Sequence, residues 1–86
     1  MLSCEEYKTL PLPEQASYLQ HYGCYLHSRI QGWCQVKLYA LGKFYVEEWF
    51  YYDLQSSGLI RVLNHPSHLE PYLRHIHLKL PNFPGA

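Results

Sequence analysis

Two adjacent glutamates, Glu47 and Glu48, are the residues of this 86-residue chain that best suit proton-transfer chemistry. Apolar and polar residues alternate around them, so one carboxylate is expected to face outward and the other to lie in or near the core. A carboxylate on an apolar face tends to have a raised pKa, which is one requirement of a general acid or base. With a histidine such as His27, either glutamate could serve a small enzyme or ligand-binding domain with a shallow cleft. The alternative is that Glu48 reaches water or Arg61 near the edge of the sheet.

Histidines gather toward the C-terminal end, where His65 and His68 are three residues apart and His75 and His77 are two apart. Helical metal ligands usually need a spacing of three or four, and strand ligands can use two. No carboxylate or thiolate is placed convincingly beside these histidines, so solvated or capping roles are expected and no metal site is predicted. The chain also has no catalytic nucleophile motif, phosphate loop or cofactor fingerprint, and no cofactor is expected.

The aromatic content, nine Tyr, two Trp and three Phe, is more than one small core can bury. Tyr and Trp combine a large apolar area with a hydrogen-bonding tip, which is typical of the centre of protein interfaces. We therefore expect a non-enzymatic interaction module that forms a homodimer, or binds another protein, through one aromatic face of its sheet. The alternative is a solvated face stabilised by cross-strand aromatic pairs and by Lys37 near Glu47. The predicted interface residues are Tyr25, Trp33, Tyr39, Tyr45, Trp49 and Tyr51, and the predicted ligand or ion-pair residues are His27, Arg29, Lys37, Glu47 and Glu48.

A third function class, the binding of single-stranded nucleic acid, would use exposed aromatic rings for base stacking and Arg29 and Lys37 for phosphates. Seven Lys plus Arg balance seven Asp plus Glu, so no net positive field favours a polyanion or an anionic membrane. Nucleic acid is therefore disfavoured as a partner. No apolar run approaches the roughly 18 residues that cross a bilayer, and the first residues lack the pattern of a secretory signal, so we expect a cytoplasmic protein.

The length and composition indicate one folded domain. Hydrophobic residues make up 48% of the chain and charged residues 16%, the reverse of the balance in disordered chains. We expect a single compact domain over residues 1–80 and a C-terminal tail over 81–86, where Pro81, Pro84 and Gly85 disfavour regular structure. Cysteines 4, 24 and 34 are odd in number and form no CxxC pair, which favours free thiols.

The elements follow from periodicity and from turn residues. A Pro-Leu-Pro break at 11–13 ends any first helix early, and apolar residues at helical spacing up to Gly23 predict a helix over residues 12–22. Alternation with a period of two then predicts strands over 24–31, 33–40 and 44–51, with a short fourth strand over 59–63. A short helix is expected within residues 67–77. The fold class is therefore α+β: a three- to four-stranded antiparallel meander with N- and C-terminal helices packed on one face.

The register of the strands decides which residues share a face. A two-residue loop at Gln31 and Gly32 would set Arg29 opposite Cys34, beside apolar residues. A three-residue loop with glycine in the left-handed position pairs Ile30 with Cys34 instead, and we prefer it. The same choice at the next turn pairs Val36 with Phe50. Odd and even positions from 24 to 51 then form one apolar face and one aromatic, polar face.

Overall fold

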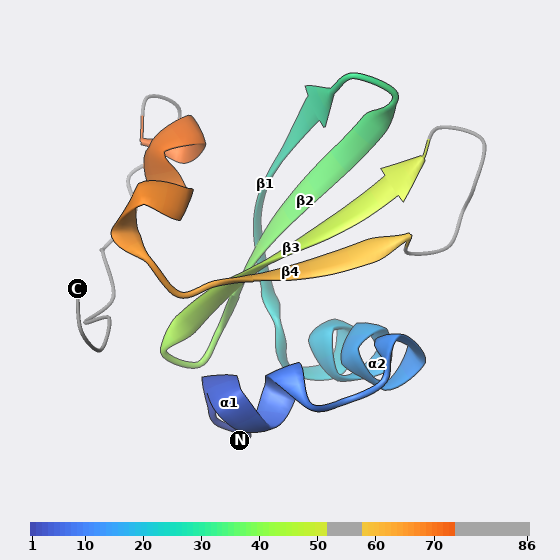
Figure 1. Cartoon of the computed structure of the whole chain (residues 1–86), viewed down its shortest axis with the longest axis vertical. Coiled ribbons are helices and arrows are strands. Elements are labelled where there is room, and N and C mark those ends of the chain that lie inside the picture. Colours follow the sequence, from blue (N-terminus) through green and yellow to red (C-terminus); the bar gives the residue numbers. More distant parts are fainter. Residues whose placement is uncertain (52–57, 74–86) are drawn as a thin grey trace.

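The α+β class and the predicted order of elements are confirmed by the computed structural model, which describes residues 1–51 and 58–73. The predicted tail and the end of the predicted last helix lie outside these residues. The four strands form one antiparallel sheet in the order β1-β2-β3-β4, so β1 and β4 are its edges (Figure 1). The elements are α1 (Cys4–Lys8), α2 (Leu12–Tyr22), β1 (Cys24–Gln31), β2 (Cys34–Leu41), β3 (Phe44–Tyr51), β4 (Leu59–Leu63) and the 3-10 helix η1 (Pro66–Tyr72).

The helix predicted over 12–22 is α2, which ends where Gly23 donates its backbone N–H to the Leu19 carbonyl oxygen at 2.8 Å. A Cβ atom at Gly23 would lie 2.5 Å from that oxygen, so this close approach requires glycine. The shorter α1 begins with a capping box: the Ser3 hydroxyl accepts from the Glu6 backbone N–H, and the Glu6 side chain accepts from the Ser3 backbone N–H. The prolines that follow explain why α1 stays short.

Both hairpin turns have two residues, and the predicted register is wrong by one residue in each. Gly32 and Gly42 take the first central position with φ of +58° and +63°, as in a type II′ turn. Gln31 therefore pairs with Cys34 and Leu41 with Phe44. The predicted three-residue loops also required glycine in the left-handed conformation, so a positive φ was expected for either turn length. Glycine content alone could not distinguish these turns.

This register places Val36 directly opposite both Arg29 and Trp49, so these residues share one face of the sheet. The predicted single aromatic face is consequently wrong. A β-bulge between Tyr25 and His27 changes the alternation within β1 as well. Tyr25 pairs with Tyr39 on one face, whereas His27 pairs with Leu38 on the other.

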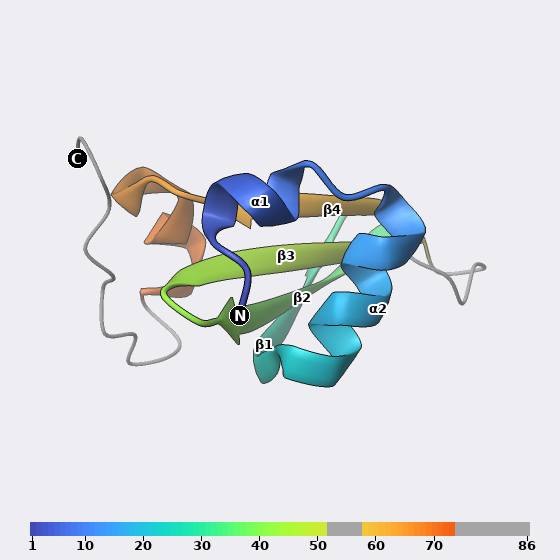
Figure 2. The same cartoon turned by 90° about the horizontal axis from the view of Figure 1, so that it is seen from below.

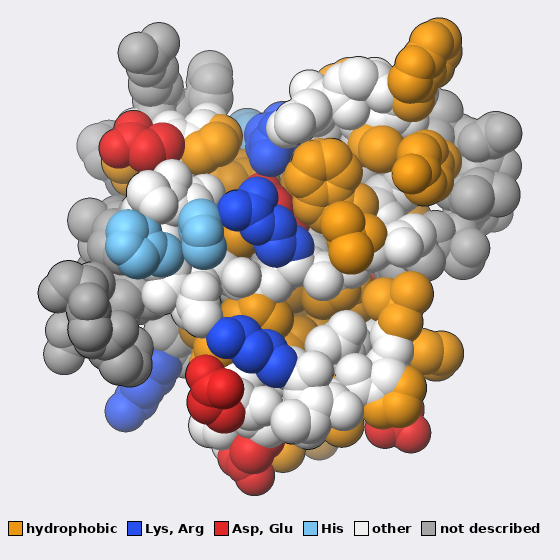
Figure 3. Space-filling view, in the orientation of Figure 1, with side chains coloured by type: hydrophobic (Ala, Val, Ile, Leu, Met, Phe, Trp, Pro, Cys, Tyr) orange, Lys and Arg blue, Asp and Glu red, His pale blue; other side chains and the backbone are white. Residues whose placement is uncertain are grey.

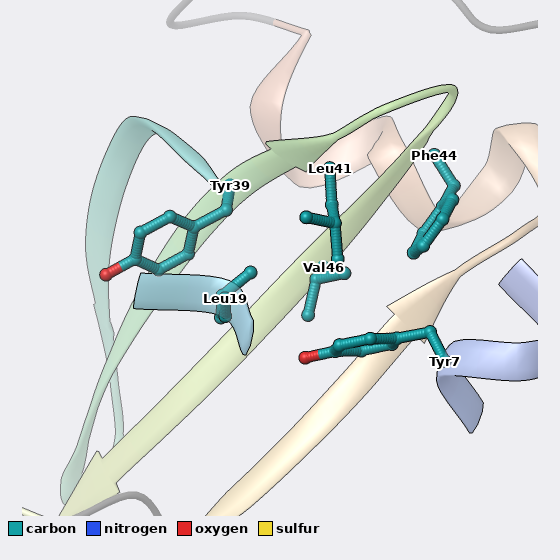
Figure 4. Packing of buried hydrophobic residues seen from close by; sticks show 6 residues of the cluster. All are labelled: Tyr7, Leu19, Tyr39, Leu41, Phe44 and Val46. Atoms are coloured by element: carbon teal, nitrogen blue, oxygen red, sulfur yellow. The ribbon is translucent and has the colours of Figure 1, made fainter. Parts of the chain in front are cut away.

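Each face of the sheet carries its own hydrophobic cluster. The first packs against α1 and α2 and consists of Tyr7, Leu19, Tyr39, Leu41, Phe44 and Val46 (Figure 4). The second packs against η1 and consists of Leu38, Tyr45, Leu63, Leu69 and Tyr72. Because successive residues of a strand point to opposite faces, Leu38 and Tyr39 assign the clusters to opposite sides of the sheet. The N- and C-terminal helices were predicted to pack on one face of the sheet, but they pack on opposite faces. Figure 1 and Figure 2 show η1 apart from α1 and α2.

Candidate functional site

The most elaborate polar arrangement is built around Glu47, whose carboxylate is buried between the sheet and η1. The Tyr72 hydroxyl donates to its Oε2 at 2.6 Å, and Arg29 Nη2 donates to the same oxygen at 3.1 Å. Trp49 Nε1 donates to Oε1 at 3.2 Å, and Arg61 Nη1 lies 3.7 Å from Oε1. Four side chains therefore satisfy one buried carboxylate. We call Arg29, Glu47, Trp49, Arg61 and Tyr72 the Glu47 cluster.

Arg29 connects the parts of the Glu47 cluster. Its guanidinium lies 5.7 Å from the ring centre of Trp49 and 5.3 Å from that of Tyr72, distances typical of cation–π contacts. Its Nε donates to the Tyr72 hydroxyl oxygen at 3.2 Å, and its Nη1 donates to the side-chain oxygen of Gln31. Strand β1 is thereby tied to β3 and η1 through one side chain.

The strand register brings the cluster together. Leu38 has His27 on one side and Glu47 on the other, and Glu47 pairs in turn with Arg61 of β4. Arg29 reaches Glu47 diagonally across β2. Glu47 and Arg29 were predicted separately as ligand or ion-pair residues, and Arg61 was expected beside Glu48, which is wrong because it lies beside Glu47. Tyr72 was not predicted, because nothing in the local sequence indicates that this ring returns to the centre of the sheet.

Glu48 is also buried, on the opposite face beneath α2, so neither glutamate faces outward as one was expected to do. Gln20 Nε2 lies 3.4 Å from Glu48 Oε1 and 3.5 Å from the Tyr39 hydroxyl oxygen. Burial is the main cause that raises the pKa of the Tyr39 phenol; Glu48 raises it further, and the Gln20 amide lowers it. Both glutamates are hydrogen-bonded within the fold, an arrangement suited to holding elements together.

The buried phenols of Tyr72 and Tyr7 are expected to make the folded chain less stable at alkaline pH. Burial raises the pKa of both phenols, as do Glu47 for Tyr72 and Glu48 for Tyr7. A phenol whose pKa is higher in the folded than in the unfolded chain stabilises the fold fully below the unfolded pKa of about 10. This contribution is lost as pH rises through the folded pKa. Urea denaturation from about pH 8 to 11 should therefore give a free energy of unfolding that falls above about pH 10.

The matched variants are Tyr72→Phe and the exposed Tyr22→Phe. Tyr72→Phe should make the alkaline decline shallower, by at most about 1.4 kcal/mol per pH unit, and Tyr22→Phe should leave it as in the parent. Equal slopes in all three proteins would contradict the assignment.

The six predicted interface aromatics do not form one surface. Tyr39 and Tyr45 are buried in the two opposite clusters, and Trp49 is half-buried within the Glu47 cluster. Tyr25 is exposed on the Tyr39 side of β1, where the two rings meet edge to face at 5.7 Å. The remaining predicted anchors, Trp33 and Tyr51, are exposed.

The predicted polar residues are divided in the same way. Lys37 lies opposite Glu48 rather than near Glu47, and its Nζ is 5.0 Å from the ring centre of Phe50. Arg29 and Lys37 thus point to opposite faces of the sheet, whereas the nucleic-acid hypothesis placed them on the same face. The His27 ring meets Tyr72 edge to face at 5.8 Å and lies on the Glu47 side of the sheet.

Exposed apolar side chains gather at one end of the sheet, which we call the aromatic end: Ile30, Trp33, Tyr51 and Leu59. In an antiparallel meander, the β1–β2 turn, the last residue of β3 and the first residue of β4 meet at the same end. Figure 3 shows hydrophobic side chains at this end of the molecule. Nearer the middle of the same view, basic side chains lie beside further hydrophobic ones. Trp33 has 82% of its surface exposed and is the most exposed of the four.

Among the described histidines, His65 has a capping role. Its Nδ1 accepts from the Ser67 backbone N–H at 3.2 Å at the start of η1. Within residues 1–51 and 58–73, no group of three or more His, Cys, Asp or Glu side chains could hold a metal ion. His75 and His77 lie outside these residues. Cys4, Cys24 and Cys34 are free thiols.

Fold and site together define a small α+β domain with a buried ion cluster under η1 and an apolar end to its sheet. No protein family, curated protein or solved structure matches the chain. None of the helices in the described part of the chain is both long and apolar enough to cross a membrane.

Proposed function

We propose that this protein is a small non-enzymatic interaction module that forms a homodimer through its aromatic end. The observation that carries the proposal is the exposure of Ile30, Trp33, Tyr51 and Leu59, each more than half exposed, at one end of the sheet. They come from both edge strands, the β1–β2 turn and the end of β3, so the exposed apolar groups span the width of this end. Exposed apolar groups collected in one region of a surface mark association sites. Trp and Tyr are also the side chains that most often dominate binding energy.

Self-association is favoured by the chemistry of this end. All four side chains are uncharged, and the chain has no net charge, so two copies meet without like-charge repulsion. A two-fold interface uses the same patch on both subunits, which an uncharged apolar patch satisfies. An enzymatic role is less favoured, because the carboxylates of Glu47 and Glu48 are already engaged within the fold.

Trp33→Ala tests this proposal, because it removes the largest exposed ring without disturbing either core cluster. We expect the parent to sediment as a dimer at micromolar concentration and the variant to dissociate at least about thirtyfold more readily, as for an interface hot spot. Sedimentation velocity over a concentration series measures both constants.

The matched control is Tyr22→Ala, which removes an exposed ring from α2, away from the aromatic end. It should leave the dissociation constant unchanged. A parent that stays monomeric up to about 100 μM, far above the range of specific dimers, would contradict the proposal. So would an equal effect of the two substitutions.

A further inference from the structure

A second surface feature lies at the opposite end of the sheet from the aromatic end. A cavity of about 670 Å³ opens between the start of α1 and the β2–β3 turn. Its volume falls within the roughly 300–1,000 Å³ of typical small-molecule sites. Its lining comes from three parts of the chain: residues 1–6, the turn at 42–44, and Asn64 after β4.

The walls of this cavity are mainly apolar. Met1, Leu2, Cys4 and Phe44 line it, and Phe44 belongs to the cluster that joins the sheet to α1. Burial raises the pKa of the Cys4 thiol, which favours its uncharged form. Gly42 lies at the cavity with a positive φ, and a Cβ there would lie 2.9 Å from the Met1 sulfur. The turn and the N-terminal residues therefore pack closely at this edge.

The charged groups of the lining differ in how they are engaged. The Glu6 carboxylate accepts from the Ser3 backbone N–H at 3.0 Å, and its pKa is lowered mainly by that bond. Glu5 Oε1 lies 3.6 Å from Lys8 Nζ. The Lys43 ammonium, in contrast, forms no ion pair with any carboxylate of the described residues. The cavity thus combines apolar walls with the Asn64 amide and with an ammonium that is not paired to a carboxylate in the described part of the chain.

We propose that this cavity binds a small amphipathic carboxylate, with the carboxylate against Lys43 and the apolar part along Leu2, Cys4 and Phe44. An ammonium and an amide at the edge of an apolar cavity fix the orientation of such a ligand, as the few polar groups of ligand sites do. This site is independent of the proposed dimerisation, since none of its lining residues belongs to the aromatic end.

Octanoate is a suitable probe, with 1-octanol as its uncharged counterpart. Two-dimensional amide NMR of the parent chain during an octanoate titration should show saturable shifts at Ser3, Cys4 and Lys43. Lys43→Gln should weaken octanoate binding at least about fivefold, as expected for loss of a charged hydrogen bond, and should leave octanol binding unchanged. Lys37→Gln is the matched control, because it removes a lysine from the middle of β2, and it should bind octanoate as the parent does.

The proposal is overturned if octanoate causes no saturable shift at these amides, or if the shifts centre on Trp33 instead. If the parent and Lys43→Gln bind octanoate with equal affinity, the ligand carboxylate does not contact Lys43 and that part of the proposal is overturned. Lys43 is an exposed turn residue, so the amide spectrum of its variant should retain the dispersion of the parent and report on binding directly.

Discussion

Glu47→Ala is expected to lower the free energy of unfolding by about 3 kcal/mol, because it leaves a largely buried guanidinium without its counter-ion. Arg29 then has no carboxylate, and the Tyr72 hydroxyl and Trp49 N–H lose their acceptor. Removing one partner of a buried ion pair typically costs about 3–5 kcal/mol. We expect the lower end of that range, since Arg61 is half-exposed and can turn to water.

Urea denaturation followed by tryptophan fluorescence suits this measurement, since Trp49 belongs to the cluster. The exposed Glu70→Ala on η1 is the matched control and should change the free energy of unfolding by less than about 0.5 kcal/mol. A double variant, Glu47→Leu with Arg29→Met, removes both charges and keeps apolar side chains in place. It therefore distinguishes the cost of leaving a charge unpaired from the cost of lost packing. Replacement of a buried pair by apolar residues is often neutral, so the double variant should be more stable than Glu47→Leu alone. If Glu47→Ala and Glu70→Ala unfold alike, the Glu47 cluster does not stabilise the fold.

Tyr7→Ala is expected to cost about 4 kcal/mol, the range observed when a fully buried aromatic residue is truncated. The Tyr7 ring is fully buried and lies 5.8 Å from Phe44 and 5.9 Å from Tyr18, measured between ring centres. Its hydroxyl donates to the Gln15 carbonyl oxygen at 2.9 Å, and the Gln15 amide donates back to the Tyr7 carbonyl oxygen. One side chain therefore joins α1, α2 and the sheet.

Domains of this size are commonly stable by about 4–13 kcal/mol, so Tyr7→Ala should remove a large fraction of the total. Tyr7→Phe retains the ring and should cost only about 1 kcal/mol, for the lost hydrogen bond. Thermal and urea denaturation followed by circular dichroism give both values, with Tyr22→Ala as an exposed control. A cost for Tyr7→Ala no larger than that for Tyr22→Ala would show that α1 contributes little to the fold.

The elements of the fold could be predicted from the sequence because their signals are local. Helical spacing between Pro13 and Gly23 gave α2 with its observed bounds, and period-two alternation gave β1 and β3. The register could not be predicted, because both faces of the sheet are buried against other elements. Leu38 and Tyr39 are both core residues, so a shift of one residue left the apolar pattern equally satisfied.

The candidate site could be predicted only in part, because its contacts join residues that are far apart in the sequence. The sequence by itself determined the strands, the positions of the turns along the chain and the presence of paired carboxylates, since these depend on neighbouring residues, whereas it did not determine the length of either turn. Only the tertiary structure decided that Glu47 meets Arg29, Arg61 and Tyr72, because these residues are far apart in the chain and are brought together by strand pairing and by the return of η1. Tertiary packing also decided which aromatic rings are buried, leaving Trp33 exposed while it enclosed Tyr39 and Tyr45.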